Sequence, residues 1–342
     1  MSTVDLEKTA VALVADGKGI LAADETPNTL TKRFAALKID STPDSRRAYR
    51  EMFFTTPDIA KFISGVIMQD ETIHQKSSNG TPLADVLSQQ SIIPGIKVDT
   101  GAKILAGSPE ETVTEGLDGL RDRLANYRQL GARFAKWRAV IRITSELPSS
   151  ACINVNAHAL ARYAALCQEQ GLVPIVEPEV LMDGSHSLER CENVTSKVLQ
   201  ATFNALIEQR VSLEGMLLKP NMVISGKDCP RQASIEEVAL ATTRCLRRNT
   251  PAAVPGIVFL SGGQDHVTAT RHLNAINKWH GPKPWKLGFS YGRALQDEAL
   301  QAWCGKEENI PAAHHAFSHR AKCVSAAALG KYTQVMEREL AA

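Results

Sequence analysis

The sequence predicts an α/β protein folded as a single parallel (β/α)8 TIM barrel, and three observations support this fold class. Short apolar runs rich in branched residues recur along all 342 residues, stretches of helical period separate them, and no glycine- or serine-rich linker divides the chain. Runs without strict polar alternation are typical of parallel strands buried on both faces. Eight runs favour one closed barrel over a doubly wound sheet. We therefore expect one domain over residues 1–342 with extra N- and C-terminal helices, residues 312–342 forming a helical tail.

The strand candidates are bounded by glycine, proline or charged residues. They are residues 19–23, 62–68, 95–98, 134–141, 172–176, 215–218, 256–260 and 286–290. Between them, apolar residues at helical spacing predict helices. These cover residues 116–127, 156–169, 189–210, 234–248 and 293–303. We expect a loop-rich insertion at residues 77–94.

The composition is that of an ordinary globular protein, 44% hydrophobic and 22% charged with a formal net charge of +2. No basic stripe marks a nucleic-acid partner. No window approaches the roughly 18 consecutive apolar residues of a membrane span, and Asp5 and Glu7 stand where a secretory signal carries positive charge. We therefore expect neither membrane insertion nor export.

Cysteine and histidine usage indicates a reduced, metal-free protein. The seven cysteines are scattered without a C-x-x-C pair, which is typical of free thiols in the cytoplasm. One tight histidine cluster, His314, His315 and His319, could share a helix face, but no carboxylate or cysteine beside it completes a ligand set. We expect no metal and no cofactor.

The strand candidates carry or lead into polar residues near their ends. In a barrel enzyme the active site lies at the carboxyl ends of the strands, although polar residues also mark strand ends simply because loops begin there. The residues in question are Asp24, Lys97, Lys136, Arg138, Glu177, Lys219, Ser261 and Arg293.

Three lysines interrupt apolar segments, Lys97, Lys136 and Lys219. Burial of an ammonium group is unfavourable unless it is paired or deprotonated. Desolvation and a neighbouring cation both favour the neutral amine, which is how a Schiff-base lysine is prepared. Glu177 offers the acid/base group that the dehydration of a carbinolamine needs, or alternatively forms a salt bridge to one of these lysines.

Two glycine-containing loops predict a phosphate site. They are FLSGGQ at 259–264 and FSYGRA at 289–294, after the seventh and eighth strand candidates, where barrel enzymes often bind phosphate. Their glycines allow backbone N–H groups to approach an anion, and Arg293 adds a planar fork that matches phosphate. The alternative is an ordinary pair of glycine turns.

Seven segments together resemble the class I fructose-bisphosphate aldolase family. They are GKGILAADET, GIKVD, FAKWRAVI, VPIVEPEVL, LLKPNMV, FLSGGQ and FSYGRALQ. The resemblance implies a (β/α)8 barrel and a metal-independent lyase that cleaves fructose 1,6-bisphosphate reversibly to glycerone phosphate and glyceraldehyde 3-phosphate in glycolysis and gluconeogenesis. It also implies a phosphosugar substrate and a homotetramer.

The resemblance assigns roles by matching motif positions. In the catalytic set, Lys219 is the Schiff-base lysine, Glu177 the principal acid/base, Glu179 a supporting acid, Asp24 an aid to carbon–carbon cleavage and Lys136 a positive charge beside the imine. The 1-phosphate set is Ser261, Gly262, Gly263, Ser290, Gly292 and Arg293. Arg33, Lys97 and Arg138 complete the substrate contacts, with Lys97 toward the 6-phosphate end.

Three departures from the family pattern stand out. Thr26 and Thr29 replace two serines that bind the 6-phosphate in many members, with Pro27 between them, so hydroxyl groups are kept. Thr100 stands where lysine is common. The tyrosine of the family's C-terminal tail has no counterpart, since Tyr332 lies in a helix-like segment, and we expect groups of the barrel to protonate the enamine instead.

Three other functions stay open at this point. The first is a Schiff-base lyase for another phosphosugar, and the second is a non-catalytic phosphosugar-binding scaffold, which would need neither Lys219 nor Glu177. The third is a metal-dependent aldolase, which would need histidines where this chain has lysines.

Overall fold

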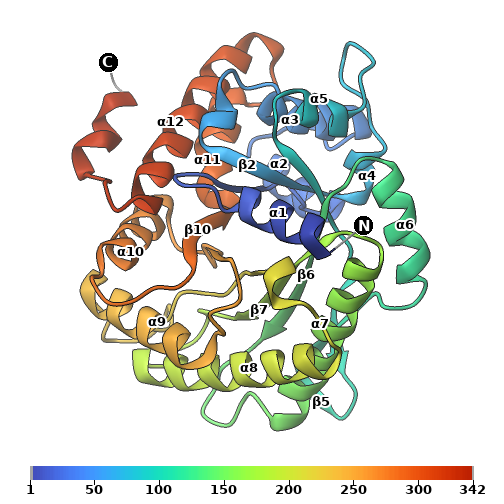
Figure 1. Cartoon of the computed structure of the whole chain (residues 1–342). Coiled ribbons are helices and arrows are strands. Elements are labelled where there is room, and N and C mark those ends of the chain that lie inside the picture. Colours follow the sequence, from blue (N-terminus) through green and yellow to red (C-terminus); the bar gives the residue numbers. More distant parts are fainter. Residues whose placement is uncertain (1–2, 341–342) are drawn as a thin grey trace.

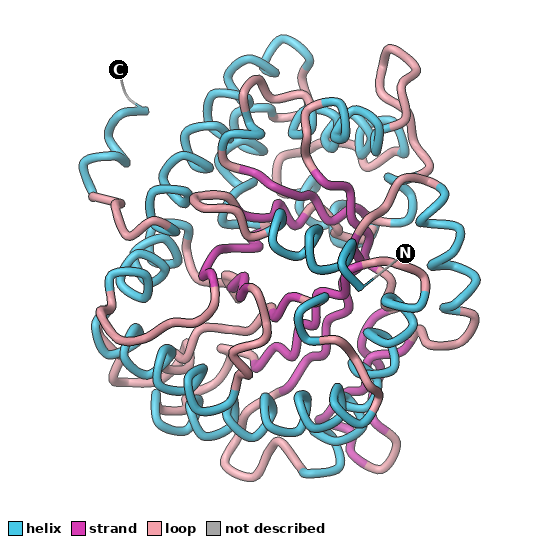
Figure 2. The backbone as a smooth tube through the Cα atoms, viewed as in Figure 1, coloured by secondary structure: helices cyan, strands magenta, loops and turns pink. Residues whose placement is uncertain are grey.

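Eight parallel strands close into a barrel, in agreement with the predicted fold class. The structure is a computed structural model that describes residues 3–340. Hydrogen-bonded neighbours follow the order β1-β10-β9-β8-β7-β6-β3-β2, and helices surround this ring (Figures 1 and 2). The barrel strands are β1 (Gly19–Ala22), β2 (Ile63–Met68), β3 (Ile93–Lys97), β6 (Phe134–Ile141), β7 (Val173–Val180), β8 (Leu217–Leu218), β9 (Gly256–Phe259) and β10 (Lys286–Tyr291).

The predicted helices are present, with shifted ends. Serine or aspartate side chains cap several of them: Ser149 accepts the N–H of Cys152 and so starts its helix earlier than expected. Among the described residues no helix is both long and apolar enough to cross a membrane. The α-helices are α1 (Thr3–Leu13), α2 (Pro27–Ala35), α3 (Pro43–Phe54), α4 (Asp70–Ile73), α5 (Leu83–Gln89), α6 (Leu120–Gln129), α7 (Ser150–Glu169), α8 (Leu188–Glu208), α9 (Ile235–Asn249), α10 (His266–Lys278), α11 (Arg293–Trp303) and α12 (Ile310–Ala328); short 3-10 helices cover Ile59–Lys61, Leu213–Gly215, Glu307–Asn309 and Gln334–Leu340.

Two segments differ from the sequence-based expectation. The predicted loop at 77–94 is wrong in part, because α5 and the start of β3 lie within it. Four apolar residues of α5, from Leu83 to Leu87, are buried, so tertiary packing stabilises a helix too short to be recognised from its period. In addition, β4 (Gly101–Leu105) and β5 (Ser108–Glu115) form an antiparallel hairpin outside the barrel, which the mostly polar sequence did not indicate.

One end of the barrel, where the strands begin, is closed by apolar side chains. Leu13 and Val14, at the end of α1, belong to a buried cluster with Phe134, Val173 and Val258 of the strands. In Figure 1, α1 lies across the middle of the strand ring. The hydroxyl of Ser64 donates to the carbonyl oxygen of Leu13 at 2.6 Å, which holds α1 in place. We call this region the closed end.

Phe134 fills the closed end only because Gly95 lies opposite it on β3. A Cβ on Gly95 would stand 2.2 Å from the ring atom Cζ of Phe134. Any larger residue at position 95 therefore requires the ring to move.

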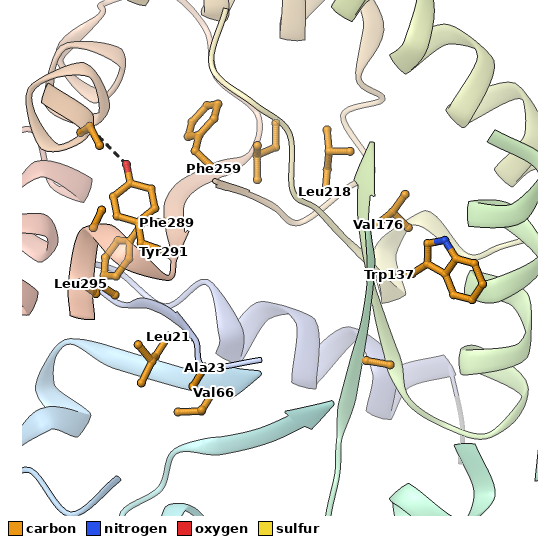
Figure 3. Packing of buried hydrophobic residues seen from close by; sticks show 14 of the residues in the cluster. Leu21, Ala23, Val66, Trp137, Val176, Leu218, Phe259, Phe289, Tyr291 and Leu295 are labelled. Carbon is orange, nitrogen blue, oxygen red and sulfur yellow. Dashed lines mark hydrogen bonds between the residues drawn. The ribbon is translucent and has the colours of Figure 1, made fainter. Parts of the chain in front are cut away.

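Alternate strand residues face outward and pack against the helices. Figure 3 shows such residues, among them Leu21, Trp137, Val176 and Tyr291. The Trp137 ring stacks on Tyr163 of α7 with centroids 5.6 Å apart, and the Tyr291 hydroxyl donates to the Ala269 carbonyl of α10 at 3.2 Å. Because successive strand residues point to opposite faces, the neighbours of these residues project into the barrel.

Candidate active site

A pocket of about 480 Å³ opens where the strands end, and every predicted site residue lines it. The strands bring together residues that are far apart in the sequence, as the barrel fold predicts. The predicted residues that line it are Asp24, Thr26, Thr29, Arg33, Lys97, Lys136, Arg138, Glu177, Glu179, Lys219, Ser261, Gly262, Gly263, Ser290, Gly292 and Arg293.

This pocket is not the largest hollow. One of about 670 Å³ shares Asp183 with it and is lined by residues of 142–145 and 183–190. Its Arg190 donates to the backbone carbonyls of Thr144, Ser145 and Leu147, so that cation holds a loop together. We assign the chemistry to the smaller pocket because the reactive ion pairs lie there.

The base of the pocket holds four charged groups in contact, of which Lys136, Glu177 and Lys219 are buried and the side chain of Asp24 is 11% exposed. The Nζ of Lys136 lies 2.7 Å from Oδ2 of Asp24 and 3.1 Å from Oε2 of Glu177. The Nζ of Lys219 lies 3.1 Å from the other carboxylate oxygen of Glu177, Oε1. Glu177 therefore bridges the two lysines, which is the salt bridge that the sequence left as an alternative.

The two lysines differ in their electrostatic surroundings. Burial lowers the pKa of Lys219; Glu177 opposes this, and the nearby ammonium of Lys136 adds to it, so that the pKa is below that of an ordinary lysine. Burial would also lower the pKa of Lys136, but Asp24 and Glu177 outweigh it and raise that pKa. Lys136 therefore stays an ammonium ion, whereas Lys219 gives up its proton more readily.

The neighbouring lysines lower the pKa values of the two carboxylates, Asp24 and Glu177. Burial alone would raise the pKa of Asp24, but Lys136 and then Lys219 outweigh it and lower the pKa to about 2. The pKa of Glu177 is also lowered, because the same lysines and Arg138 overcome its burial. Both side chains are thus anionic near neutral pH.

Lys97, Arg138 and Glu179 form the wall beside this centre. Nζ of Lys97 lies 2.6 Å from Oδ1 of Asp99, and Nε of Arg138 is paired with Oε2 of Glu179. Asp99 accepts the backbone N–H of Arg138 at 3.3 Å, which joins the two pairs. Each cation of this wall is thus held by a carboxylate.

Arg33 is held by three residues that are not among the predicted site residues. Its Nη1 donates to Glu25 at 2.6 Å and to Gln296 at 2.8 Å, and its Nη2 donates to Asp297 at 2.7 Å. Glu25 also accepts from Arg50, at 2.6 Å. The available signal was the position of Glu25, directly after Asp24 at a strand end.

Thr26 and Thr29 lie at the start of α2. Thr26 is its N-cap: its hydroxyl accepts the N–H of Thr29 at 3.3 Å, and the two hydroxyl oxygens are 3.1 Å apart. Pro27 is the first helical residue, a position that proline suits, so the departure from the family pattern is locally stable.

The opposite side of the pocket offers donors to an anion. The hydroxyl of Ser290 is buried and has no hydrogen-bond partner within the described residues. Arg293 is exposed at the first position of α11, and no carboxylate of residues 4–338 pairs with it. A free guanidinium and helix N-terminal N–H groups are what a phosphate needs.

The histidine cluster of α12 lies elsewhere. His319 donates from Nε2 to the Met336 carbonyl at 2.8 Å, in a packing contact with the last 3-10 helix. Across residues 3–340, no three histidine, cysteine, aspartate or glutamate side chains are grouped as a metal site.

Comparisons with known proteins give consistent matches over nearly the whole chain. The family model described as fructose-bisphosphate aldolase class-I matches residues 5–342. A "probable fructose-bisphosphate aldolase class 1" of Xanthomonas axonopodis pv. citri is 57% identical over 333 residues, 97% of this chain and 99% of that protein. A cytosolic fructose-bisphosphate aldolase of Arabidopsis thaliana is 53% identical over 96% of this chain and 84% of its own length. The solved structure of a Plasmodium falciparum fructose-bisphosphate aldolase, in complex with TRAP and a small-molecule inhibitor, superposes with a TM-score of 0.95 at 49% identity, covering 97% of this chain and 96% of that one.

Proposed function

The chain belongs to the class I fructose-bisphosphate aldolase family, and from this premise we propose how its own residues carry out the reaction. The protein is a metal-independent lyase that cleaves fructose 1,6-bisphosphate through a Schiff base. The observation that carries the assignment of residues is the Glu177 carboxylate, shared between Lys136 and Lys219.

Lys219 is the nucleophile. Its lowered pKa increases the fraction of neutral amine, which attacks C2 of the ketose and forms a C–N bond. The attacking nitrogen releases a proton to the Glu177 carboxylate, 3.1 Å from Lys219 Nζ, and Glu177 then passes that proton to the C2 hydroxyl of the carbinolamine, which leaves as water. The product is an iminium ion, which is the electron sink for the next step.

Cleavage follows from the same group of charges. Glu177 or Asp24 takes the proton of the C4 hydroxyl, the C3–C4 bond breaks, and its electron pair moves into the iminium to give an enamine. Lys136 stays protonated between the two carboxylates and keeps them oriented. Protonation of the enamine and hydrolysis of the imine then release glycerone phosphate.

The two ends of the pocket hold the two phosphates. We assign Ser261, Gly262, Gly263, Ser290, Gly292 and Arg293 to the 1-phosphate end. Thr26, Thr29 and Lys97 serve the 6-phosphate end, while Arg33 and Arg138 complete the substrate contacts and Glu179 supports the catalytic group; all of these residues line the pocket. Holding both ends makes the reaction effectively intramolecular.

We also propose the features that lie beyond the site. The whole of 1–342 acts as one domain with 312–342 as its tail, of which residues 341 and 342 lie outside the described part. The protein works in the cytoplasm, in line with its cytosolic relative in Arabidopsis thaliana. It does so as a homotetramer, as the resemblance to the family implies.

Borohydride reduction in the presence of glycerone phosphate, followed by peptide mass mapping, tests the central assignment. We expect one reduced adduct, on Lys219. An adduct on Lys136 or Lys97 instead would overturn the assignment. A panel of one- and two-phosphate sugars, run with the same preparation, measures which substrate is preferred.

A further inference from the structure

The Ser261–Gln264 turn has an unusual backbone that needs support. The N–H of Gln264 donates to the Ser261 carbonyl at 3.0 Å and closes a four-residue turn. Both central residues are left-handed, with φ of 61° at Gly262 and 91° at Gly263. This is the pattern of a type I′ turn, which normally joins two paired strands. Here it joins β9 to α10, so no strand pairing fixes its shape.

The side chains of Gln264 and His272 stabilise the conformation of this turn through hydrogen bonds. Nε2 of Gln264 donates to the same Ser261 carbonyl at 3.0 Å, and Oε1 of Gln264 lies 2.6 Å from Nδ1 of His272 on α10. A carbonyl can only accept, so the Gln264 amide must present its NH2 to Ser261 and its oxygen to His272. His272 therefore carries its proton on Nδ1 and donates it to Gln264.

The charge state of His272 is consistent with this direction. The side chain is 6% exposed, and burial, with a smaller contribution from Arg271, lowers its pKa to about 4. Near neutral pH the ring is neutral with a single N–H, and Gln264 accepts it. The two hydrogen bonds therefore have a single donor-to-acceptor direction, from His272 of α10 to Gln264 and from Gln264 to the Ser261 carbonyl in the turn.

The turn is in close contact with the phosphate end of the pocket. A Cβ on Gly263 would stand 3.3 Å from Nη2 of Arg293, and one on Gly262 would stand 3.9 Å from Oε1 of Glu179. Gln264 and His272 are not among the residues that line the substrate pocket. They can act on the substrate only through the turn.

We propose that His272 and Gln264 are positioning residues that hold the Ser261–Gly263 backbone in the conformation that binds the 1-phosphate group. The proposal rests on the proposed function of this pocket. Their removal loosens the turn, so its N–H groups lose their alignment with the phosphate, while Lys219 and Glu177 stay in place.

The test compares Gln264→Met, which keeps the approximate shape but removes the hydrogen bonds to Ser261 and His272 together with a weak one to Sδ of Met222 at 3.8 Å, with Gln232→Met. Gln232 is the matched control because its Nε2 also donates to two carbonyls, those of Gly226 and Cys229, both at 2.9 Å, in a loop outside the pocket. Loss of one to two hydrogen bonds should raise KM for fructose 1,6-bisphosphate about fivefold to tenfold, with kcat within about twofold. Gln232→Met should change neither.

Inhibition by each of the two products shows at which phosphate end of the pocket Gln264→Met weakens binding. Glycerone phosphate carries the 1-phosphate, whereas glyceraldehyde 3-phosphate carries the phosphate of the other end. We expect the inhibition constant of glycerone phosphate to rise with KM in Gln264→Met and that of glyceraldehyde 3-phosphate to stay unchanged. Equal weakening of both products, or an unchanged KM, would overturn the proposal.

A second pair of variants gives an independent readout. His272→Leu removes the donor to Gln264 and should raise KM as Gln264→Met does, whereas His272→Gln keeps a donor and should restore part of the affinity. Equal KM values in these two variants would contradict a positioning role. Borohydride trapping of Lys219 in the wild-type protein separates this outcome from a failure of the proposed function, which would show no adduct on Lys219 at all.

Discussion

The two ends of the barrel use the same strands in opposite ways. Along β6, the inward-facing row begins with Phe134 and continues with Lys136 and Arg138, and along β7 the row begins with Val173 and reaches Glu177. Closely packed apolar side chains fill the closed end. Paired charged side chains line the opposite end, which contains the pocket and which we call the open end. We therefore expect changes of side-chain volume at the closed end to affect the stability of the fold, and changes of charge at the open end to affect activity.

Physical chemistry sets what each end contributes. Apolar burial at the closed end stabilises the fold by roughly 25 cal/mol for each Å² removed from water. Buried ion pairs contribute little net stability, because their attraction must first offset the loss of hydration. The charges of Asp24, Lys136, Glu177 and Lys219 therefore serve reactivity more than folding, and substitutions at the two ends should separate these properties.

The largest effect is expected at the open end. Lys219→Ala removes the only amine that the mechanism uses, so cleavage should fall by at least about 10⁴-fold and borohydride labelling should vanish. Because Glu177 keeps Lys136 as an ion-pair partner at 3.1 Å, the change leaves no buried charge unpaired, and the free energy of unfolding in urea should fall by no more than about 1 kcal/mol. A strong loss of stability would mean that the two ends are not separable in this way.

The next effect belongs to the closed end. Gly95→Ala places a Cβ 2.2 Å from the Phe134 ring and should lower the free energy of unfolding by about 3 kcal/mol. Activity per folded molecule should be kept. The control is Gly288→Ala on β10, where a Cβ would meet its nearest atoms at 3.4 and 3.8 Å and should be tolerated. Equal unfolding curves for the two variants would contradict packing at Gly95 as the cause.

A smaller effect, on substrate binding, is expected at the exposed Arg293. Arg293→Ala should raise KM about tenfold while kcat falls much less, because a guanidinium that holds the 1-phosphate acts in both the ground and transition states. Steady-state kinetics beside Arg248→Ala, an exposed arginine in α9 outside the pocket, provides the comparison. A collapse of kcat at constant KM would show that Arg293 acts on the transition state instead.

The smallest effect is a pH dependence of stability. The folded-state pKa of Asp24, about 2, lies below its ordinary value of 3.8, so its contribution to stability is present above pH 4 and is lost as pH falls from about 4 to about 2. Asp24→Asn should remove roughly 1–2 kcal/mol of this acid dependence. The measurement is urea unfolding at several pH values, and identical pH profiles for the two proteins would refute it.

The strand positions and the pocket residues at the strand ends could be predicted from local sequence: an apolar run identifies a strand, and the polar residue that ends or follows it identifies a pocket position, as for Lys219 after Leu218. Other pocket residues, among them Arg33 and Thr26, were predicted only from the resemblance to the family. The ion pairs between the pocket residues could not be predicted from local sequence. Lys136 and Lys219 look alike in the sequence, and only the geometry shows that one touches two carboxylates and the other touches one. The support that Gln264 and His272 give to the turn depends likewise on how α10 packs.

The contact of α1 with the barrel has a consequence for how the chain reaches its structure. Leu13 and Val14 leave the ribosome early, yet the cluster they cover includes Val258 of β9, made near the end of synthesis. Contacts between such distant parts of a chain form slowly, because a long loop must close before they do. Until β9 is made, the apolar residues of α1 can pack only on strands that are already synthesised, such as β1 and β2. Although α1 is made before the barrel strands, it therefore completes its docking late, and in the nascent chain its apolar residues stay partly exposed, which favours aggregation.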